Sequence, residues 1–207
     1  MLLTGALQLG SAITTGAGSS VDVSAGATLD LGGFTLNTSG DLTVNGTLSG
    51  GSIALAGGQT LKGAGTITGS VTVADGATVS PGNSPGTLTT GTLVLNDATV
   101  LDFQLDGPGP NDMIAVTGDL TLDGILNVAD LGGLEVGQYT LLTYTGSLTD
   151  NGLTLGTLPG AFTYSITNTG SSNGSVILNV SIIPEPATLG LLSLGGLMML
   201  KRRRHSA

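Results

Sequence analysis

The sequence lacks cysteine and tryptophan, and aromatic and charged residues make up only 3% and 9% of its 207 residues. Without cysteine, neither a disulfide framework nor a thiolate metal site can form. The single histidine, His205, lies next to the C-terminus. No Ser-His-Asp, Cys-His or histidine-based metal site can therefore be assembled in the body of the chain. These absences exclude most hydrolase mechanisms and predict a protein that is not an enzyme and that needs no cofactor or metal.

Basic residues are also scarce, and they are unevenly placed. Residues 1–183 hold thirteen Asp or Glu against one base, Lys62, a balance of −12. Residues 184–207 hold Glu185 against four bases, a balance of +3. An acidic body repels phosphate backbones and anionic lipid surfaces. We therefore expect no nucleic-acid partner.

Glycine, with 36 residues, and alternating aliphatic residues are abundant. Apolar residues recur at every second position in short pieces such as Val21/Val23, Leu42/Val44 and Val71/Val73. This period of two is typical of β-strands, and the Gly, Asn and Asp pairs between the pieces are typical of tight turns. No segment before residue 187 shows a sustained helical period, so the pattern predicts an all-β body.

Two internal repeats indicate a stack of coils. Residues 21–28 (VDVSAGAT) resemble residues 71–78 (VTVADGAT), 50 positions later, and residues 41–48 (DLTVNGTL) resemble residues 119–126 (DLTLDGIL), 78 positions later. Unequal offsets favour coils of variable length around roughly 20 residues, each burying its apolar edge against its neighbours. A β-sandwich would contain similar strands but usually uses more aromatic and charged residues.

Residues 60–145, and above all 80–88 (SPGNSPGTL), resemble the β-helical stalk of autotransporter passengers. The resemblance implies a right-handed parallel β-helix, which we assign to residues 1–132. Residues 133–183 contain four of the six aromatic residues, and we expect them to form an antiparallel β cap over the last coil. The four aromatic residues are Tyr139, Tyr144, Phe162 and Tyr164. The alternative is that they form a carbohydrate-binding platform.

Residues 184–207 have a different character. Pro184-Glu185-Pro186 ends any strand, residues 187–200 are all uncharged, and four bases follow at once. As a helix, the uncharged segment would rise roughly 21 Å, against about 30 Å of bilayer hydrocarbon. Snorkelling bases could close part of this gap, and their position predicts a short transmembrane helix with the body outside the cytoplasm. A terminal amphipathic or buried apolar helix is the alternative.

This order of features resembles the PEP-CTERM protein-sorting domain, over residues 184–207 only. The resemblance implies that the chain is a substrate of an exosortase, a membrane-embedded cysteine transpeptidase of Gram-negative bacteria that make exopolysaccharide. It further implies that Pro184, Glu185 and Pro186 are the recognition motif. The same resemblance assigns membrane retention to the basic cluster Lys201, Arg202, Arg203 and Arg204.

Together these features predict an exported, non-catalytic structural protein of the cell envelope or extracellular matrix. Its precursor would be anchored in the inner membrane, and exopolysaccharide is a possible partner. The rival prediction is a polysaccharide-binding or polysaccharide-active β-helix, a lyase or a glycosidase that uses the turn carboxylates Asp102, Asp106 and Asp112. The same aspartates could bind calcium, or they could be solvated turn residues that maintain solubility.

The first ten residues contain no basic residue and only a diluted apolar run, unlike a signal peptide. We therefore expect the true start of the protein to lie upstream of Met1, with this chain beginning inside a coil.

Overall fold

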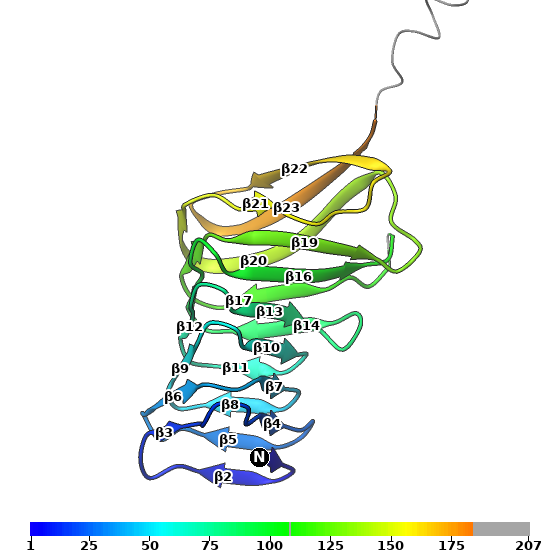
Figure 1. Cartoon of the computed structure of the whole chain (residues 1–207). Coiled ribbons are helices and arrows are strands. Elements are labelled where there is room, and N and C mark those ends of the chain that lie inside the picture. Colours follow the sequence, from blue (N-terminus) through cyan, green and yellow to red (C-terminus); the bar gives the residue numbers. More distant parts are fainter. Residues whose placement is uncertain (108, 184–207) are drawn as a thin grey trace, which may run out of the picture.

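The computed structural model describes residues 1–107 and 109–183, and every regular element among them is a β-strand. The strands β1 to β18 follow one another in groups of three, and each group forms one coil of a parallel β-solenoid of six coils (Figure 1). The expected all-β solenoid is confirmed.

The solenoid has three sides, which we name A, B and C. Side A consists of β1 (Leu2–Leu3), β4 (Val21–Val23), β7 (Leu42–Val44), β10 (Thr60–Gly63), β13 (Thr78–Pro81), β16 (Val100–Leu105), β19 (Ile125–Asp130) and β21 (Thr154–Leu155). Side B consists of β2 (Ala6–Gln8), β5 (Thr28–Asp30), β8 (Thr47–Ser49), β11 (Thr66–Ile67), β14 (Thr87–Thr90), β17 (Met113–Val116) and the first half of β20 (Gly137–Asp150). Side C consists of β3 (Ile13–Thr14), β6 (Thr35–Thr38), β9 (Ser52–Leu55), β12 (Val71–Val73), β15 (Leu93–Val94), β18 (Leu120–Leu122) and the second half of β20.

The core is a set of aliphatic ladders that run along the solenoid. On side A the Cα partners Leu42, Leu61, Val79, Leu101 and Leu126 stack one above another, and all five side chains are buried. Alternate residues point to opposite faces of a strand, so the period-two pattern places one aliphatic residue of each strand in its ladder. Burial of these side chains between neighbouring coils drives the stacking.

Coil length varies, as the unequal repeat offsets predict. The chain takes a shorter path from Leu61 to its stacked partner Val79 than from Leu126 to its stacked partner Leu155. The later coils are longer because β16 and β19 have six residues each and long loops follow them. In Figure 1 the end that contains β16 and β19 is correspondingly wider than the end that contains β2 and β5.

The repeated octapeptides turn out to be corners and not whole coils. Residues 21–28 lead from β4 on side A to β5 on side B, whereas residues 71–78 lead from β12 on side C to β13 on side A. In both corners the N–H after the turn donates to the carbonyl three residues earlier, Ala27 to Ser24 at 2.9 Å and Ala77 to Ala74 at 3.1 Å. The third turn residue is a glycine with φ of 78° at Gly26 and 75° at Gly76, the geometry of a type II turn.

An antiparallel layer follows the last parallel strands. β23 (Ser172–Ile182) pairs antiparallel with β20, and β22 (Phe162–Asn168) pairs antiparallel with β23. Tyr144 on β20 is buried beneath this layer, and its hydroxyl donates to the Gly170 carbonyl. A Cβ atom at Gly174 would overlap that hydroxyl, so a larger residue where β23 crosses Tyr144 would force the tyrosine side chain to shift. This layer lies within the range assigned to the cap.

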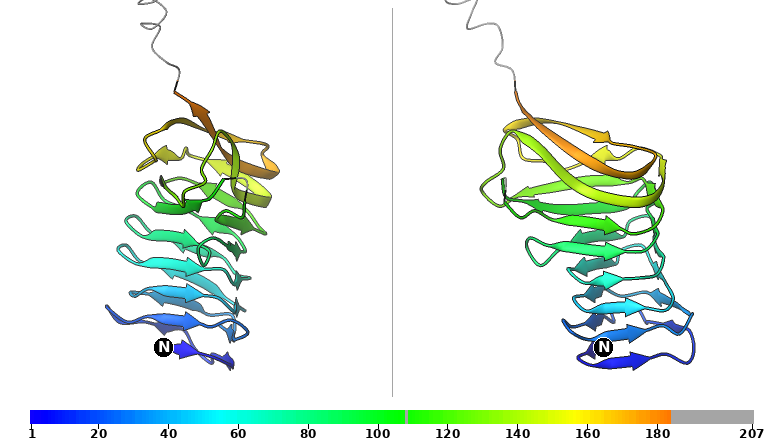
Figure 2. Two further views of the ribbon diagram at one scale, coloured as in Figure 1. Left: turned by 90° about the vertical axis from the view of Figure 1, so that its right-hand side faces the viewer. Right: turned by 180° about the vertical axis from the view of Figure 1, so that it is seen from behind.

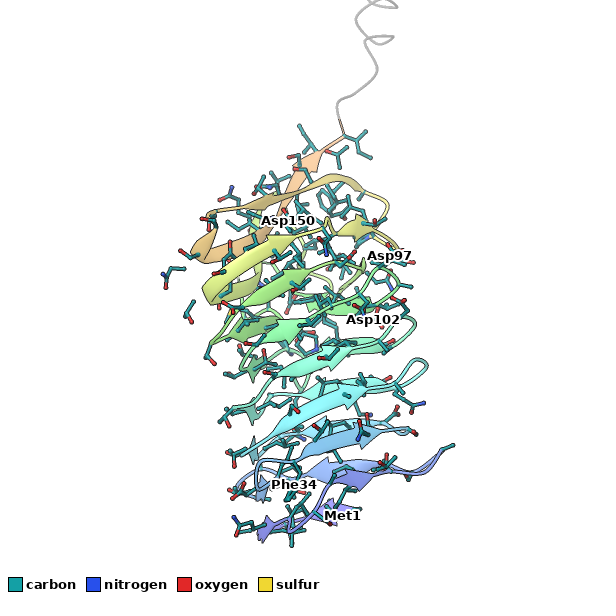
Figure 3. All side chains as sticks on the ribbon, turned by 90° about the vertical axis from the view of Figure 1, so that its left-hand side faces the viewer. Met1, Phe34, Asp97, Asp102 and Asp150 are labelled. Carbon is teal, nitrogen blue, oxygen red and sulfur yellow. The ribbon has the colours of Figure 1, made fainter. Side chains whose placement is uncertain are left out.

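The opposite end of the solenoid presents the apolar side chains of its first coils. Met1 and Leu2 are 53% and 67% exposed, and Leu7 and Phe34 are also exposed. Figure 3 labels Met1 and Phe34 at this end, and Asp97, Asp102 and Asp150 in the half nearer the antiparallel layer.

Candidate functional site

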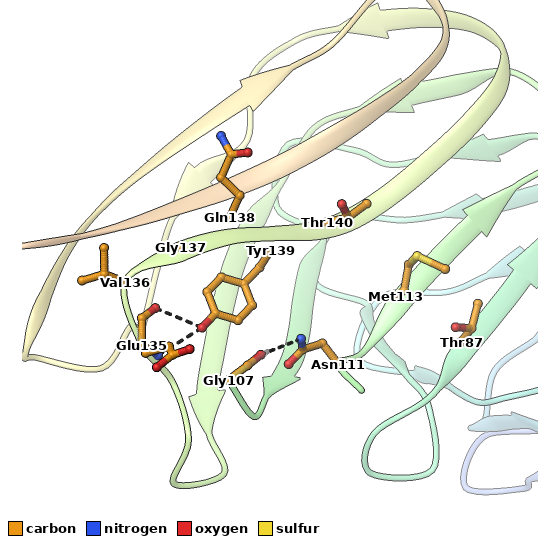
Figure 4. Close-up of a pocket in the computed structure, with 10 residues that line it drawn as sticks. All are labelled: Thr87, Gly107, Asn111, Met113, Glu135, Val136, Gly137, Gln138, Tyr139 and Thr140. Carbon is orange, nitrogen blue, oxygen red and sulfur yellow. Dashed lines mark hydrogen bonds between the residues drawn. The ribbon is translucent and has the colours of Figure 1, made fainter. Parts of the chain in front are cut away.

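One cleft lies on side B, where β14, β17 and β20 are bordered by two long loops (Figure 4). Its volume is about 450 Å³. One loop follows β16 and contributes Gly107 and Asn111, and the other follows β19 and contributes Glu135 and Val136. The remaining lining residues are Thr87, Met113, Gly137, Gln138, Tyr139 and Thr140.

The polar groups of this first cleft are largely used within the protein. The Tyr139 hydroxyl accepts from the Glu135 N–H and donates to the Glu135 carbonyl, both at 3.0 Å (Figure 4). The Asn111 amide donates to the carbonyls of Gly107 and Gly109 at 3.1 and 3.0 Å. These bonds hold the two loops in shape, and Glu135 is the one carboxylate among the ten lining residues.

A second cleft, of about 410 Å³, lies on the outer face of side A. Asp102 on β16 accepts from the Asn127 amide of the next coil at 2.8 Å, and the Asn127 side-chain oxygen accepts from the Thr157 N–H at 2.8 Å. Ser80 and Gln104 add a hydroxyl and an amide to the same lining. The lining is completed by Phe103, Val128, Ala129 and Thr157.

The three aspartates singled out in the sequence have different environments. Asp102 lines the second cleft, and Asp106 lies in the loop after β16. Asp112 is 1% exposed, so it is not a solvated turn carboxylate, and its two oxygens accept from the N–H groups of Gly86 at 2.9 Å and Gln104 at 2.8 Å. Burial raises the pKa of the Asp112 carboxyl, an effect that these two hydrogen bonds oppose.

Neither cleft contains two carboxylates, whereas a glycosidase needs a pair that flanks the scissile bond. Among the described residues no group of three or more His, Cys, Asp or Glu side chains is placed to hold a metal ion. Asp112 instead joins two coils by binding the loop after β13 and the strand β16.

Several turn aspartates also bind backbone across coils, a role that the sequence analysis missed. Asp41 accepts from the Thr60 N–H at 2.9 Å, and Asp75 accepts from the Ala98 N–H at 3.0 Å. Each partner lies one coil further along the chain. These turn carboxylates are therefore not only solvated groups that maintain solubility, because they also bind backbone N–H groups of the next coil. The sequence signal that could have indicated this role is an Asp next to a strand that recurs along the chain, with a turn about one coil length away.

The aromatic residues of the range 133–183 mostly pack inside the protein. Tyr139 and Tyr144 are 5% and 2% exposed, so neither ring presents a face on which a sugar could stack. Phe162 and Tyr164 are half-buried and contact each other edge to face, with ring centroids 6.4 Å apart.

The sorting motif Pro184, Glu185 and Pro186, the apolar segment 187–200 and the basic cluster 201–204 lie outside the described residues. Within the described ranges, no helix has the length and apolar character to cross a membrane.

Comparison with known proteins gives one informative similarity. The chain is 49% identical over 89 residues to the adhesin BmaC autotransporter of Brucella suis biovar 1 (strain 1330). The matched stretch covers 39% of this chain and 3% of that adhesin, so this chain spans a small fraction of its relative. No family model matches the sequence.

Proposed function

We propose that this protein is an exported, non-catalytic component of the cell envelope or extracellular matrix, structural or adhesin-like in role. The observation that carries the proposal is that a chain folded as a parallel β-solenoid is 49% identical, over 89 residues, to an autotransporter adhesin. A stacked solenoid offers a rigid, extended body, which is what a surface spacer or presenter needs.

The export route belongs to the same proposal. Residues 184–207 act as a PEP-CTERM signal, in which an exosortase recognises Pro184, Glu185 and Pro186. The segment 187–200 forms a short transmembrane helix that holds the precursor in the inner membrane, and Lys201, Arg202, Arg203 and Arg204 retain it there. The solenoid is right-handed, and the β20–β23–β22 layer caps its last coil.

Mass spectrometry of the mature C-terminus from native cells tests this route. We expect the mature protein in the envelope or outside the cell, with residues after the Pro-Glu-Pro motif removed. A P184A/P186A double variant should accumulate as an uncleaved membrane-bound precursor, and a control variant, S181A, should be processed normally. Recovery of the native protein from the cytosol with Ala207 still attached would contradict the proposal.

Binding of a polysaccharide is a second candidate, and the polar lining of the side A cleft favours it. Ser80, Asp102 and Gln104 offer a hydroxyl, a carboxylate and an amide to a polyhydroxylated ligand. Because residues 1–183 carry a balance of −12, we expect neutral chains to be preferred over acidic ones. Isothermal titration with neutral and acidic oligosaccharides checks this, and an S80A/Q104A variant should bind the neutral ligand more weakly while T43A does not.

A further inference from the structure

The strand β22 (Phe162–Asn168) has one hydrogen-bonded neighbour among the described strands, β23, and its other edge is open. Figures 1 and 2 place β22 at the end of the molecule farthest from the N-terminus, as the outermost strand of the antiparallel layer. In an open edge the backbone N–H and C=O groups that point away from the sheet can pair with another strand.

The residues of β22 supply none of the usual protections, although Asp150 lies beside its last residue and accepts from the Asn168 amide at 2.6 Å. Natural edge strands are guarded by charges, prolines or bulges, yet β22 reads FTYSITN and pairs with β23 without interruption over all seven residues. No charged residue occurs anywhere in residues 151–183. The backbone N–H and C=O groups of this edge can therefore pair with a neutral strand.

The distribution of charge points to a second copy as that strand. The fourteen charged side chains of residues 1–183 all lie between Asp22 and Asp150, and thirteen of them are acidic. Two copies that approach side by side bring many like charges together, whereas two copies that pair antiparallel through β22 place their Asp150 carboxylates, each bound to Asn168, at opposite ends of the paired strands. A second copy can therefore reach the edge of β22 with little electrostatic repulsion.

We propose that two copies of this chain pair through β22 in antiparallel register, with the two-fold axis at Ser165. This register places all seven residues opposite a partner. Thr163 lies opposite Thr167 of the second copy and Tyr164 lies opposite Ile166, which gives hydroxyl pairs on the exposed face and aromatic with β-branched pairs on the half-buried face. Both kinds of pair stabilise antiparallel strands.

The absence of native cysteine allows a direct test on the full chain in mild detergent. In an S165C variant the two new thiols meet at the two-fold axis, and mild oxidation should yield a disulfide-linked dimer. A matched control is T72C, on the exposed face of β12, which has neighbours on both edges. We expect cross-linking about a thousandfold faster for S165C, because pairing raises the effective thiol concentration from micromolar to millimolar.

Charge variants test the register. T163K/T167K places lysines opposite lysines and should give monomers in sedimentation velocity. T163K/T167E places each lysine opposite a glutamate of the second copy, so the dimer should persist. Both variants keep the apolar C-terminal segment, so association through that segment would leave T163K/T167K dimeric and overturn the proposal. Equal cross-linking rates for S165C and T72C would overturn it as well.

Discussion

At the scale of single residues, the aspartates of this protein act mainly as acceptors for backbone N–H groups. Asp41, Asp75 and Asp119 each bind an N–H one coil further along, at 2.7 to 3.0 Å. A turn at the edge of a coil leaves donors that the parallel ladder does not satisfy, and an unpaired buried donor is costly. Carboxylates at these positions connect successive coils.

Replacement of Asp75 tests this role. Asp75→Ala should lower the free energy of unfolding by about 1 kcal/mol, the usual loss for one hydrogen bond, whereas Asp75→Asn should retain most of it because the amide oxygen still accepts. Urea denaturation followed by circular dichroism measures both. Asp97→Ala is the control, since Asp97 forms no side-chain hydrogen bond among the described residues. A similar loss for Asp97→Ala would point to charge and not to the hydrogen bond.

Asp112 adds a pH dependence whose sign follows from its burial. Its pKa in the folded protein lies above the ordinary value, so over the range between them the folded state binds more protons than the unfolded state. The contribution of Asp112 to stability should therefore rise as the pH falls from neutral toward about pH 4.

The comparison with Asp112→Asn isolates this contribution. The stability of the native protein relative to the variant should increase on acidification, as measured by urea denaturation at several pH values. A relative decrease would mean that the two hydrogen bonds, and not burial, dominate the pKa.

At the scale of elements, the recurring unit is the corner that joins two short strands. The same octapeptide pattern serves the corner from side A to side B and the corner from side C to side A, because each corner imposes a similar backbone path. The strand supplies one or two inward aliphatic residues, and the turn supplies a left-handed residue that changes the chain direction.

A substitution at Gly76 separates the effect of backbone conformation on stability from the effect of side-chain packing. A Cβ atom at Gly76 would meet nothing nearer than the Gly58 nitrogen at 4.0 Å, yet the φ of 75° disfavours any L side chain. Gly76→Ala should therefore cost about 1 kcal/mol of stability through backbone strain alone. Gly160→Ala is the control, because that position has free space and no positive φ. Equal thermal denaturation midpoints for the two variants would contradict the argument.

At the scale of the whole molecule, stability comes from contacts between neighbouring coils. Every parallel strand is stacked on a strand of the neighbouring coil, and the core ladders continue from one coil to the next. Such a solenoid behaves as a one-dimensional array, in which damage to one layer weakens the layers that it contacts.

Leu61 lies in the middle of this array, between Leu42 and Val79, and is fully buried. Leu61→Ala should cost about 2 to 5 kcal/mol, because the cavity lies between layers that cannot collapse. Native-state hydrogen exchange should show the largest loss of protection in β7, β10 and β13. Thr72→Ala, on the exposed face, should leave exchange unchanged, and a uniform loss over all coils would contradict the one-dimensional description.

The sequence by itself determined the fold class. Period-two apolar alternation, glycine-rich turns and variable repeat spacing can all be read along the chain without knowing which strands pair. The sequence also determined that the body is acidic and the C-terminal segment basic, and that side chains suited to catalysis are scarce. Tertiary structure alone decided which corner each repeat occupies, that Asp112 is buried while Asp102 lines a cleft, and that β22 is left with an open edge. These outcomes depend on which residues from different coils meet, and pairing between coils is set by the packing of the whole stack.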